Sequence, residues 1–261
     1  MPIQIQPLLL AGGRSSRMGT RKELLCLSDN IPIFEAQLLR LHIAFPNSTV
    51  FLSLPTPRFL AEITSSPRVE RLTQTTFRLR HQSSSFLVEV IYDHSDEPLG
   101  FNSNSGLESK SAESNQREIG PAAGLLAAHR QALSATWLVV ACDYPFFGVS
   151  ATHQLRDNSV SFDPEFGSVM CFENRDAIYE PLLGVWSPGA LELLEDNVNQ
   201  GILGPKSLVL KTQGKSIRPL GENWLFNMNT RAEYEQVMGM SPDVESIRAD
   251  INSSDPGPIP T

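Results

Sequence analysis

Two cationic side chains and one acidic side chain, far apart along the chain, are of the types that phosphoryl transfer requires. Arg17 and Lys22 lie in a glycine-rich stretch near the amino end, and Asp143 follows a run of apolar residues much further on. Arginine binds phosphate oxygens through a planar fork and lysine binds them as a point charge, so the pair can neutralise a triphosphate. A carboxylate can hold Mg²⁺ against phosphate oxygens. We therefore expect Arg17, Lys22 and Asp143 to be catalytic, with Asp143 as the metal ligand; capping of a turn before Pro145 is the structural alternative.

The cationic pair belongs to the stretch LAGGRSSRMGTRK, from Leu10 to Lys22. Glycines directly after a buried strand let the backbone approach a ligand and turn its N–H groups toward anionic oxygens. The spacing is neither the GxxxxGK[ST] of a P-loop nor the GxGxxG of a dinucleotide site. An ordinary flexible loop is the alternative, and the order of Arg17, Met18, Gly19 and Lys22 disfavours it.

The stretch resembles the LAGGxSxRMGxxK signature of the nucleotidyltransferases that include the molybdenum cofactor guanylyltransferases (MobA-like) and their cytidylyl relatives. Three further stretches resemble motifs of this family: CDYP at 142–145 its CDxP metal motif, GPAAGL at 120–125 its GPLAGL motif, and FNMNT at 226–230 the start of its FxNxNTP motif. The resemblance covers about residues 8 to 237, insertions excepted.

The resemblance implies a nucleotide side and an acceptor side of one site. The residues expected to bind the nucleotide are Leu10, Ala11, Gly12, Gly13, Arg17, Lys22, Ser53, Asp93, Gly120 and Gly124. Asn227 and Asn229 are expected on the acceptor side, where an amide offers both a donor and an acceptor. Capping of the following helix by Asn229 or Thr230 is the competing structural explanation.

Four positions depart from the family pattern. Arg21 stands where guanylyltransferases often carry Asp, and we expect it to add a positive charge beside the triphosphate. Ser53 replaces a frequent Asn, Ala122 replaces Leu, and Arg231 replaces Pro. The departures on the nucleotide side leave the identity of the base open.

The function implied by the resemblance is Mg²⁺-dependent transfer of GMP from GTP to Mo-molybdopterin, with release of pyrophosphate. The alternatives are a cytidylyl- or sugar-phosphate nucleotidyltransferase of the same fold, and a non-catalytic nucleotide-binding regulatory protein. GTP and Mo-molybdopterin are then the substrates, and transient contacts with molybdoenzymes or cofactor-insertion proteins are expected.

The elements that must position these residues alternate along the chain. Apolar runs predict buried strands ending at Ala11 and over 49–52, 86–92 and 137–141, separated by an amphipathic helix over 33–44 and a helix over 122–133. Nearly continuous apolar strands separated by helices indicate a parallel sheet covered on both faces. The fold class expected is therefore α/β: a Rossmann-like three-layer α/β/α fold with a mostly parallel central sheet, like that of the nucleotide-diphospho-sugar transferases.

The rest of the chain is less regular. Strands are expected over 167–172, 178–186 and 215–218, and helices over 188–197 and from about Arg231, whereas 64–85 reads as polar and irregular. We expect one domain over 1–240 with a mobile Ser-, Asn- and Glu-rich insertion over about 95–119. The segment 241–261 is expected to be a disordered tail.

Composition excludes several classes of function. The chain has 261 residues, with 21 Lys and Arg against 29 Asp and Glu, so its net charge of −8 argues against a nucleic-acid surface. Its apolar runs are too short to span a membrane. Three scattered cysteines suggest neither a disulfide framework nor a CxxC metal pair, and the five histidines form no zinc-ligand pattern. We expect a soluble, cytoplasmic protein.

Overall fold

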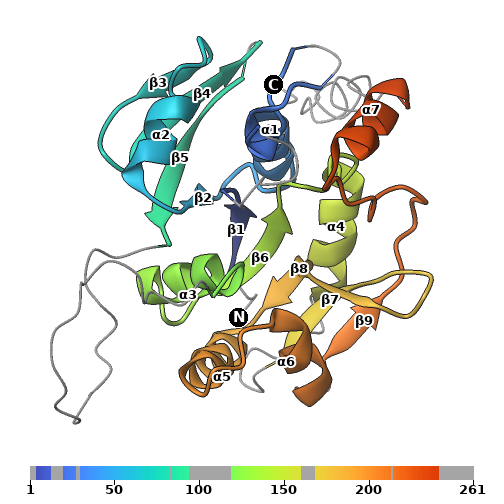
Figure 1. The fold of residues 1–261 in the computed structure, drawn as a ribbon. Coiled ribbons are helices and arrows are strands. Elements are labelled where there is room, and N and C mark those ends of the chain that lie inside the picture. Colours follow the sequence, from blue (N-terminus) through green and yellow to red (C-terminus); the bar gives the residue numbers. More distant parts are fainter. Residues whose placement is uncertain are drawn as a thin grey trace, which may run out of the picture.

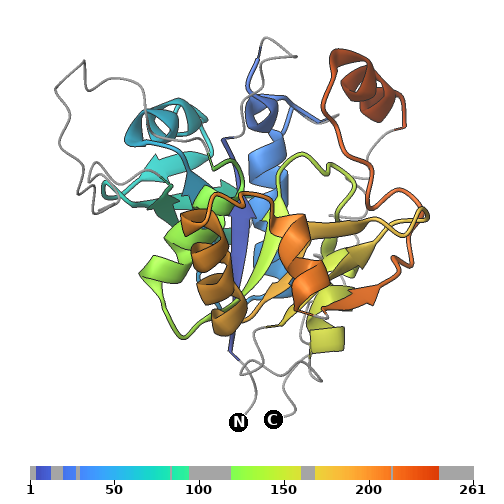
Figure 2. The ribbon, with the colours of Figure 1, turned by 60° about the horizontal axis from the view of Figure 1, so that its bottom comes forward.

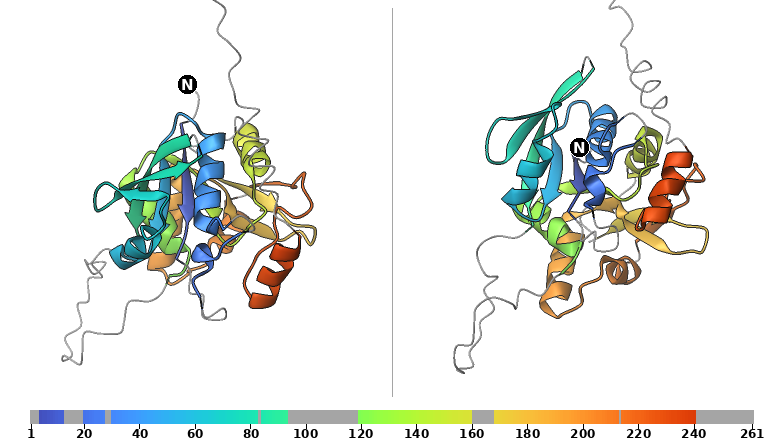
Figure 3. Two further views of the ribbon diagram at one scale, coloured as in Figure 1. Left: turned by 90° about the horizontal axis from the view of Figure 1, so that it is seen from above. Right: turned by 45° about the horizontal axis from the view of Figure 1, so that its top comes forward.

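The computed structural model describes residues 4–12, 20–27, 30–82, 84–93, 119–159, 168–212 and 214–240. Figure 1 shows their fold, and Figures 2 and 3 show it from other sides. Gly13, Arg17, the expected insertion over 95–118 and the expected tail over 241–261 lie outside these ranges.

One mixed sheet runs through the described part of the chain in the order β3-β4-β5-β2-β1-β6-β8-β7-β9. Its strands are β1 (Ile5–Leu10), β2 (Val50–Leu54), β3 (Val69–Arg71), β4 (Thr76–His81), β5 (Ser84–Tyr92), β6 (Thr136–Ala141), β7 (Val169–Glu173), β8 (Tyr179–Trp186) and β9 (Lys215–Ile217). The central four, β5, β2, β1 and β6, are parallel to one another. Antiparallel pairs extend the sheet on both sides, β3-β4-β5 on one and β6-β8-β7 on the other.

Helices cover both faces of the sheet, which makes the fold three-layered (Figure 1). They are η1 (Lys22–Leu24), α1 (Ile33–Ala44), α2 (Pro57–Ile63), α3 (Ala122–Gln131), α4 (Val149–Asn158), α5 (Pro188–Asn199), α6 (Pro205–Lys211) and α7 (Arg231–Gly239). Successive side chains of a strand point to opposite faces. Accordingly, Leu9 packs into the core under α1 and α4, while Leu8 packs into the core under α3 and α5. The expected Rossmann-like α/β class is confirmed.

The position of β1 creates the edge at which a ligand can bind. After β1 the chain moves to β2 and β5 on one side, and it later returns to β6 on the other. In open α/β sheets, ligands bind beyond the carboxyl ends of the strands at such a switch point. Leu10, Leu54, Tyr92 and Ala141 end these four strands, so the residues that follow them meet at one edge.

Two expectations for particular segments were wrong. The helix over 33–44 has the expected bounds but is not amphipathic, because ten of its residues are buried, including Glu35, Gln37 and Arg40. The segment 64–85 is not irregular, because it forms β3 and β4 and pairs with β5. Alternation places Phe77 and Leu79 of β4 inward, where they are fully buried.

Further differences concern helices. Residues 57–63, 149–158 and 205–211, for which no helix was expected, form α2, α4 and α6. The helix expected over 122–133 ends at Gln131. No helix among the described residues is both long enough and apolar enough to cross a membrane.

Candidate active site

Backbone hydrogen bonds bring three loops together beyond the carboxyl ends of the central strands. The amide of Cys142 donates to the carbonyl of Leu10 at 3.0 Å, and the amide of Ala11 donates to the carbonyl of Ser53 at 3.0 Å. The amide of Asp93 donates to the carbonyl of Leu54 at 2.9 Å. The parallel pairing thus continues one residue past each strand and fixes where the following side chains start.

Lys22 and Asp143 lie in contact at this edge. Lys22 is the first residue of η1, and its Nζ is 3.8 Å from Asp143 Oδ2 and donates to Asn229 Oδ1 at 2.6 Å. The side chains of Lys22 and Asp143 are 15% and 24% exposed, so both are held in a partly closed site that still opens to solvent. The structure therefore brings together a cation, an acid and an amide from three distant parts of the sequence.

Helix α1 holds the turn that carries Asp143. Gln37 Nε2 donates to the carbonyl of Tyr144 at 2.7 Å, and an Arg40 terminal nitrogen donates to the carbonyl of Pro145 at 2.8 Å. The amide of Met228 donates to the carbonyl of Asp143 at 2.8 Å. These contacts explain why Gln37 and Arg40 are buried in α1, because they supply hydrogen-bond donors to carbonyl groups of this turn. Sequence patterns did not single out Gln37 or Arg40.

The two asparagines of the 226–230 segment face the acid and the lysine. Asn229 Nδ2 donates to Asn227 Oδ1 at 2.6 Å, and Asn227 hydrogen-bonds Asp143. Thr230 caps α7, because its hydroxyl accepts from the amide of Glu233 while Glu233 Oε2 accepts from the amides of Asn229 and Thr230. Thr230 is thus the N-cap of α7, and the side-chain amide of Asn229 instead contacts Lys22 and Asn227.

Burial raises the pKa of Asp143, and the neighbouring Lys22 only partly offsets this effect. The carboxylate of Asp143 fits the preference of Mg²⁺ for oxygen ligands, since this ion takes one or two protein carboxylates together with substrate phosphates. Among the described residues no group of three or more His, Cys, Asp or Glu could hold a metal ion.

The expected nucleotide residues Leu10, Ser53, Asp93 and Gly124 meet at the neighbouring part of the edge. The Ser53 hydroxyl donates to Asp93 Oδ1 across the ends of β2 and β5. A Cβ atom on Gly124 would lie 2.6 Å from Ser53 Oγ and 2.8 Å from Leu10 Cδ2. Glycine at this position therefore lets the first turn of α3 pack against the Ser53–Asp93 pair.

Gly12 and Gly120 are required by the backbone. Gly12 has φ +106°, and a Cβ there would lie 2.2 Å from Pro55 Cδ. Gly120 has φ +57° at the start of α3, where a Cβ would meet no atom within 4 Å, so conformation and not space selects glycine. Gly13 and Arg17, the other expected members of the loop, lie outside the described residues.

Arg21 does not add a free positive charge beside the triphosphate site, contrary to expectation. Its guanidinium group donates to Glu23 and to Glu62, each at 2.7 Å, and stacks on the ring of Phe59. Its charge is offset by two carboxylates. The sequence offered no signal for these contacts, because Glu62 lies 41 residues away.

A further polar group lies near Asp143, around the next residue, Tyr144. The Tyr144 hydroxyl donates to Glu180 Oε2 at 3.0 Å, and Lys206 Nζ lies 4.0 Å from the same oxygen. Burial raises the pKa of Tyr144 well above its usual value, so Tyr144 stays a neutral donor. Glu180 lies on β8 and Lys206 lies on α6.

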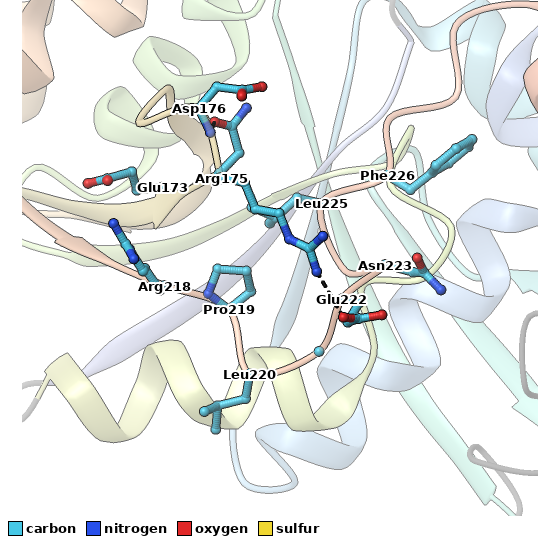
Figure 4. A pocket seen from close by; sticks show the side chains of 12 residues that line it. Glu173, Arg175, Asp176, Arg218, Pro219, Leu220, Glu222, Asn223, Leu225 and Phe226 are labelled. Carbon is cyan, nitrogen blue, oxygen red and sulfur yellow. Dashed lines mark hydrogen bonds and ion pairs between the residues drawn. The ribbon is translucent and has the colours of Figure 1, made fainter.

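A cavity of about 600 Å³ lies next to the segment that leads to Asn227. The turn after β7 and the segment 218–226 line it, and Arg175 and Glu222 form an ion pair of 2.9 Å across it (Figure 4). None of the expected site residues lines this cavity.

Comparisons with known proteins identify the family and the fold. A family model described as the MobA-like NTP transferase domain matches residues 7–214. A molybdenum cofactor biosynthesis bifunctional protein from Synechocystis sp. is 27% identical over 124 residues, which is 46% of this chain. The match spans only 33% of that curated relative.

Solved structures share the fold at low sequence identity. The crystal structure of molybdopterin-guanine dinucleotide biosynthesis protein A from Archaeoglobus fulgidus superposes with a TM-score of 0.59 at 17% identity, covering 90% of this chain and 98% of its own. A cytidylyltransferase from Leptospira borgpetersenii superposes with a TM-score of 0.58 at 12% identity, covering 99% and 100%. The near-equal scores show one fold and do not select a base.

Proposed function

The chain belongs to the MobA-like NTP transferase domain family and is a nucleotidyltransferase, and from that premise we propose that it transfers GMP from GTP to Mo-molybdopterin. The observation that carries the proposal is the contact of Lys22 with Asp143, at 3.8 Å, beyond the carboxyl ends of the central strands. The Synechocystis relative is named for molybdenum cofactor biosynthesis, which supports the acceptor.

The proposed reaction needs no side-chain nucleophile. A phosphate oxygen of the acceptor attacks the α-phosphorus of GTP, a new P–O bond forms, the bond to the β-phosphate oxygen breaks, and pyrophosphate leaves with that electron pair. The acceptor is already ionised, so the protein contributes positioning and charge neutralisation.

Each residue of the site has a role in this scheme. Lys22 neutralises the triphosphate, together with Arg17, and Asn227 and Asn229 orient the acceptor phosphate. Asp143 would hold Mg²⁺, which would offset the negative charge of the phosphate groups. Asn229 accepts the Lys22 hydrogen bond, so this amide keeps the ammonium group aimed into the site before substrate arrives.

Support for guanine comes from the Ser53–Asp93 pair. A carboxylate is a hydrogen-bond acceptor, and guanine presents two adjacent N–H donors on its pairing edge, whereas cytosine presents one amino group there. The Ser53 hydroxyl fixes one oxygen of Asp93 and so orients the carboxylate. Discrimination between the bases would follow from the second donor.

We also propose a cytoplasmic location, with transient contacts to the molybdoenzymes or cofactor-insertion proteins that would take up the product. The free thiols of Cys26, Cys142 and Cys171 support a reducing compartment.

Turnover of purified protein tests the proposal. GTP, CTP, ATP and UTP are each incubated with molybdate-loaded molybdopterin and Mg²⁺, and pyrophosphate release is measured. We expect GTP to be consumed, and Asp143→Asn to abolish release while Glu235→Gln, the same change at an exposed carboxylate of α7, leaves it unaltered. Preferential use of CTP would select the cytidylyltransferase alternative. Binding of a nucleotide without turnover in every condition would select the regulatory one, and unchanged release by Asp143→Asn would remove Asp143 from the mechanism.

A further inference from the structure

Arg21 ties the segment that carries Lys22 to helix α2. Its Nε donates to Glu23 Oε1 at 2.7 Å, and Nη1 donates to Glu62 Oε2 at 2.7 Å. The guanidinium carbon also lies 3.7 Å from the centre of the Phe59 ring. Because Phe59 and Glu62 both belong to α2, one side chain joins two segments that are far apart in the sequence.

The segment that follows Arg21 has little stability of its own. Helix η1 is three residues long, and its first turn is closed by a 3.2 Å bond from the amide of Leu24 to the carbonyl of Arg21. Short 3₁₀ helices have poor hydrogen-bond geometry, so their position depends on tertiary contacts. The Arg21 side chain contacts α2, whereas that of Lys22 contacts Asn229 and Asp143. The anchor on Arg21 therefore sets where Lys22 enters the site.

The chemistry of this anchor requires arginine. Glu23 is 1% exposed, and a buried carboxylate needs a charged partner with good geometry. A guanidinium group can bind two carboxylates in its plane and stack its face on an aromatic ring at the same time. A lysine keeps the charge but can reproduce neither the fork nor the stacking.

We propose that Arg21 is a positioning residue, which orients Lys22 toward the triphosphate by binding Glu23 and Glu62 and makes no contact with substrate itself. This inference rests on the proposed nucleotidyl transfer and assigns a role to a position where the family often carries Asp.

Two variants separate positioning from direct binding of phosphate. Glu62→Gln removes a negative charge close to the site, so a purely electrostatic role of this cluster predicts tighter NTP binding, whereas positioning predicts weaker catalysis. We expect both Glu62→Gln and Arg21→Lys to lower kcat/KM by roughly 10- to 100-fold, the scale of a misplaced catalytic group. Arg58→Gln is the matched control, because Arg58 is 87% exposed and lies 3.9 Å from the same Glu62 carboxylate. Wild-type kcat/KM in Arg21→Lys, or a lower KM for NTP in Glu62→Gln, would overturn the proposal.

A second readout does not depend on turnover. Acetylation of each lysine with acetic anhydride is followed by mass spectrometry, with the 59% exposed side chain of Lys206 as the internal reference. Lys22 should react slowly in the wild type and several-fold faster in Glu62→Gln and Arg21→Gln, with circular dichroism showing that both are folded. Unchanged Lys22 reactivity in folded variants would also overturn the proposal. If the wild type consumes no NTP but the variants show these changes in Lys22 reactivity, the proposed function is rejected and the positioning role of Arg21 stands. If the Arg21 variants do not fold, the reactivity of Lys22 in Glu62→Gln alone decides between the outcomes.

Discussion

Gly124→Ala probes the contact between helix α3 and the nucleotide side of the site. The added Cβ would lie 2.6 Å from Ser53 Oγ, 2.8 Å from Leu10 Cδ2 and 3.3 Å from Asp93 Oδ1. Ordinary van der Waals contacts begin near 3.4 Å. Either α3 or the Ser53 side chain must therefore move by roughly 0.8 Å, in an interior packed as densely as an organic crystal.

Two opposing terms set the effect of this change on stability. Forcing an extra methyl group into a packed site costs about 1–3 kcal/mol. Replacing glycine by alanine within a helix contributes about 1 kcal/mol in favour of folding. We expect a net loss of about 1 kcal/mol in the free energy of unfolding, together with a loss of GTP affinity of roughly 10- to 100-fold, because the Ser53–Asp93 pair is displaced.

Isothermal titration calorimetry with GTP and thermal unfolding measure the two effects. Gly239→Ala is the control, because Gly239 is also in a helix and a Cβ there meets no atom within 4 Å. The control should melt at the same or a slightly higher temperature, with GTP affinity unaltered. Wild-type affinity in Gly124→Ala would show that the base does not bind beside α3, and the reasoning from this glycine would fail.

Charged residues of the site and of the core give four more predictions. Lys22→Met should lower kcat/KM by about 10²- to 10³-fold, the scale of removing one group that stabilises charge in the transition state, and steady-state kinetics of pyrophosphate release would show it; a loss below threefold would contradict the assigned role. Because burial raises the pKa of Asp143, kcat/KM should begin to fall at a higher pH than is usual for an aspartate as the medium is acidified. The same raised pKa means that folding disfavours the ionised form of Asp143, so stability is lost as the pH rises from the unfolded-state pKa through the folded-state pKa. Asp143→Asn should therefore melt at a higher temperature than the wild type at pH 7. A lower melting temperature would refute this direction of the effect. Arg68→Ala should lower the free energy of unfolding by about 2–4 kcal/mol in urea titrations, because it leaves the 2% exposed Glu35 without its cationic partner. The control is Arg78→Ala, which removes an exposed ion pair with Glu70 and should lower the free energy of unfolding by less than about 1 kcal/mol.

Hydrophobic periodicity predicted the central strands and α1, because it is a property of short segments of sequence. The apolar runs at β1 and β6 are buried on both faces, as parallel strands between two helical layers must be. The bounds of α1 followed from its apolar spacing, but its burial on all sides did not, since that depends on α4 and on the turn after Asp143. The hairpin of β3 and β4 had a local signal, the alternation of Phe77 and Leu79 with arginines, which the polar composition of the region obscured.

Topology made the meeting of Lys22 and Asp143 predictable. Both residues follow strands that pair side by side and run in the same direction, so their loops lie at the same edge. The expected nucleotide pair Ser53 and Asp93 follows the same logic on β2 and β5. The domain bounds, the mobility of 95–119 and the disorder of 241–261 stay predictions.

The amino-acid sequence by itself determined the central parallel strands, α1 and α3, the edge of the sheet at which the expected site residues lie, and the residue types gathered there. Only the tertiary structure decided the partners of single side chains: Arg21 binds Glu23 and Glu62. Thr230 caps α7, and the side chain of Asn229 accepts a hydrogen bond from Lys22. The physical reason is the distance along the sequence over which each effect acts. Propensity and hydrophobic period act over a few neighbouring residues, whereas the Lys22–Asn229 hydrogen bond joins groups 207 residues apart and exists only after the whole core has packed.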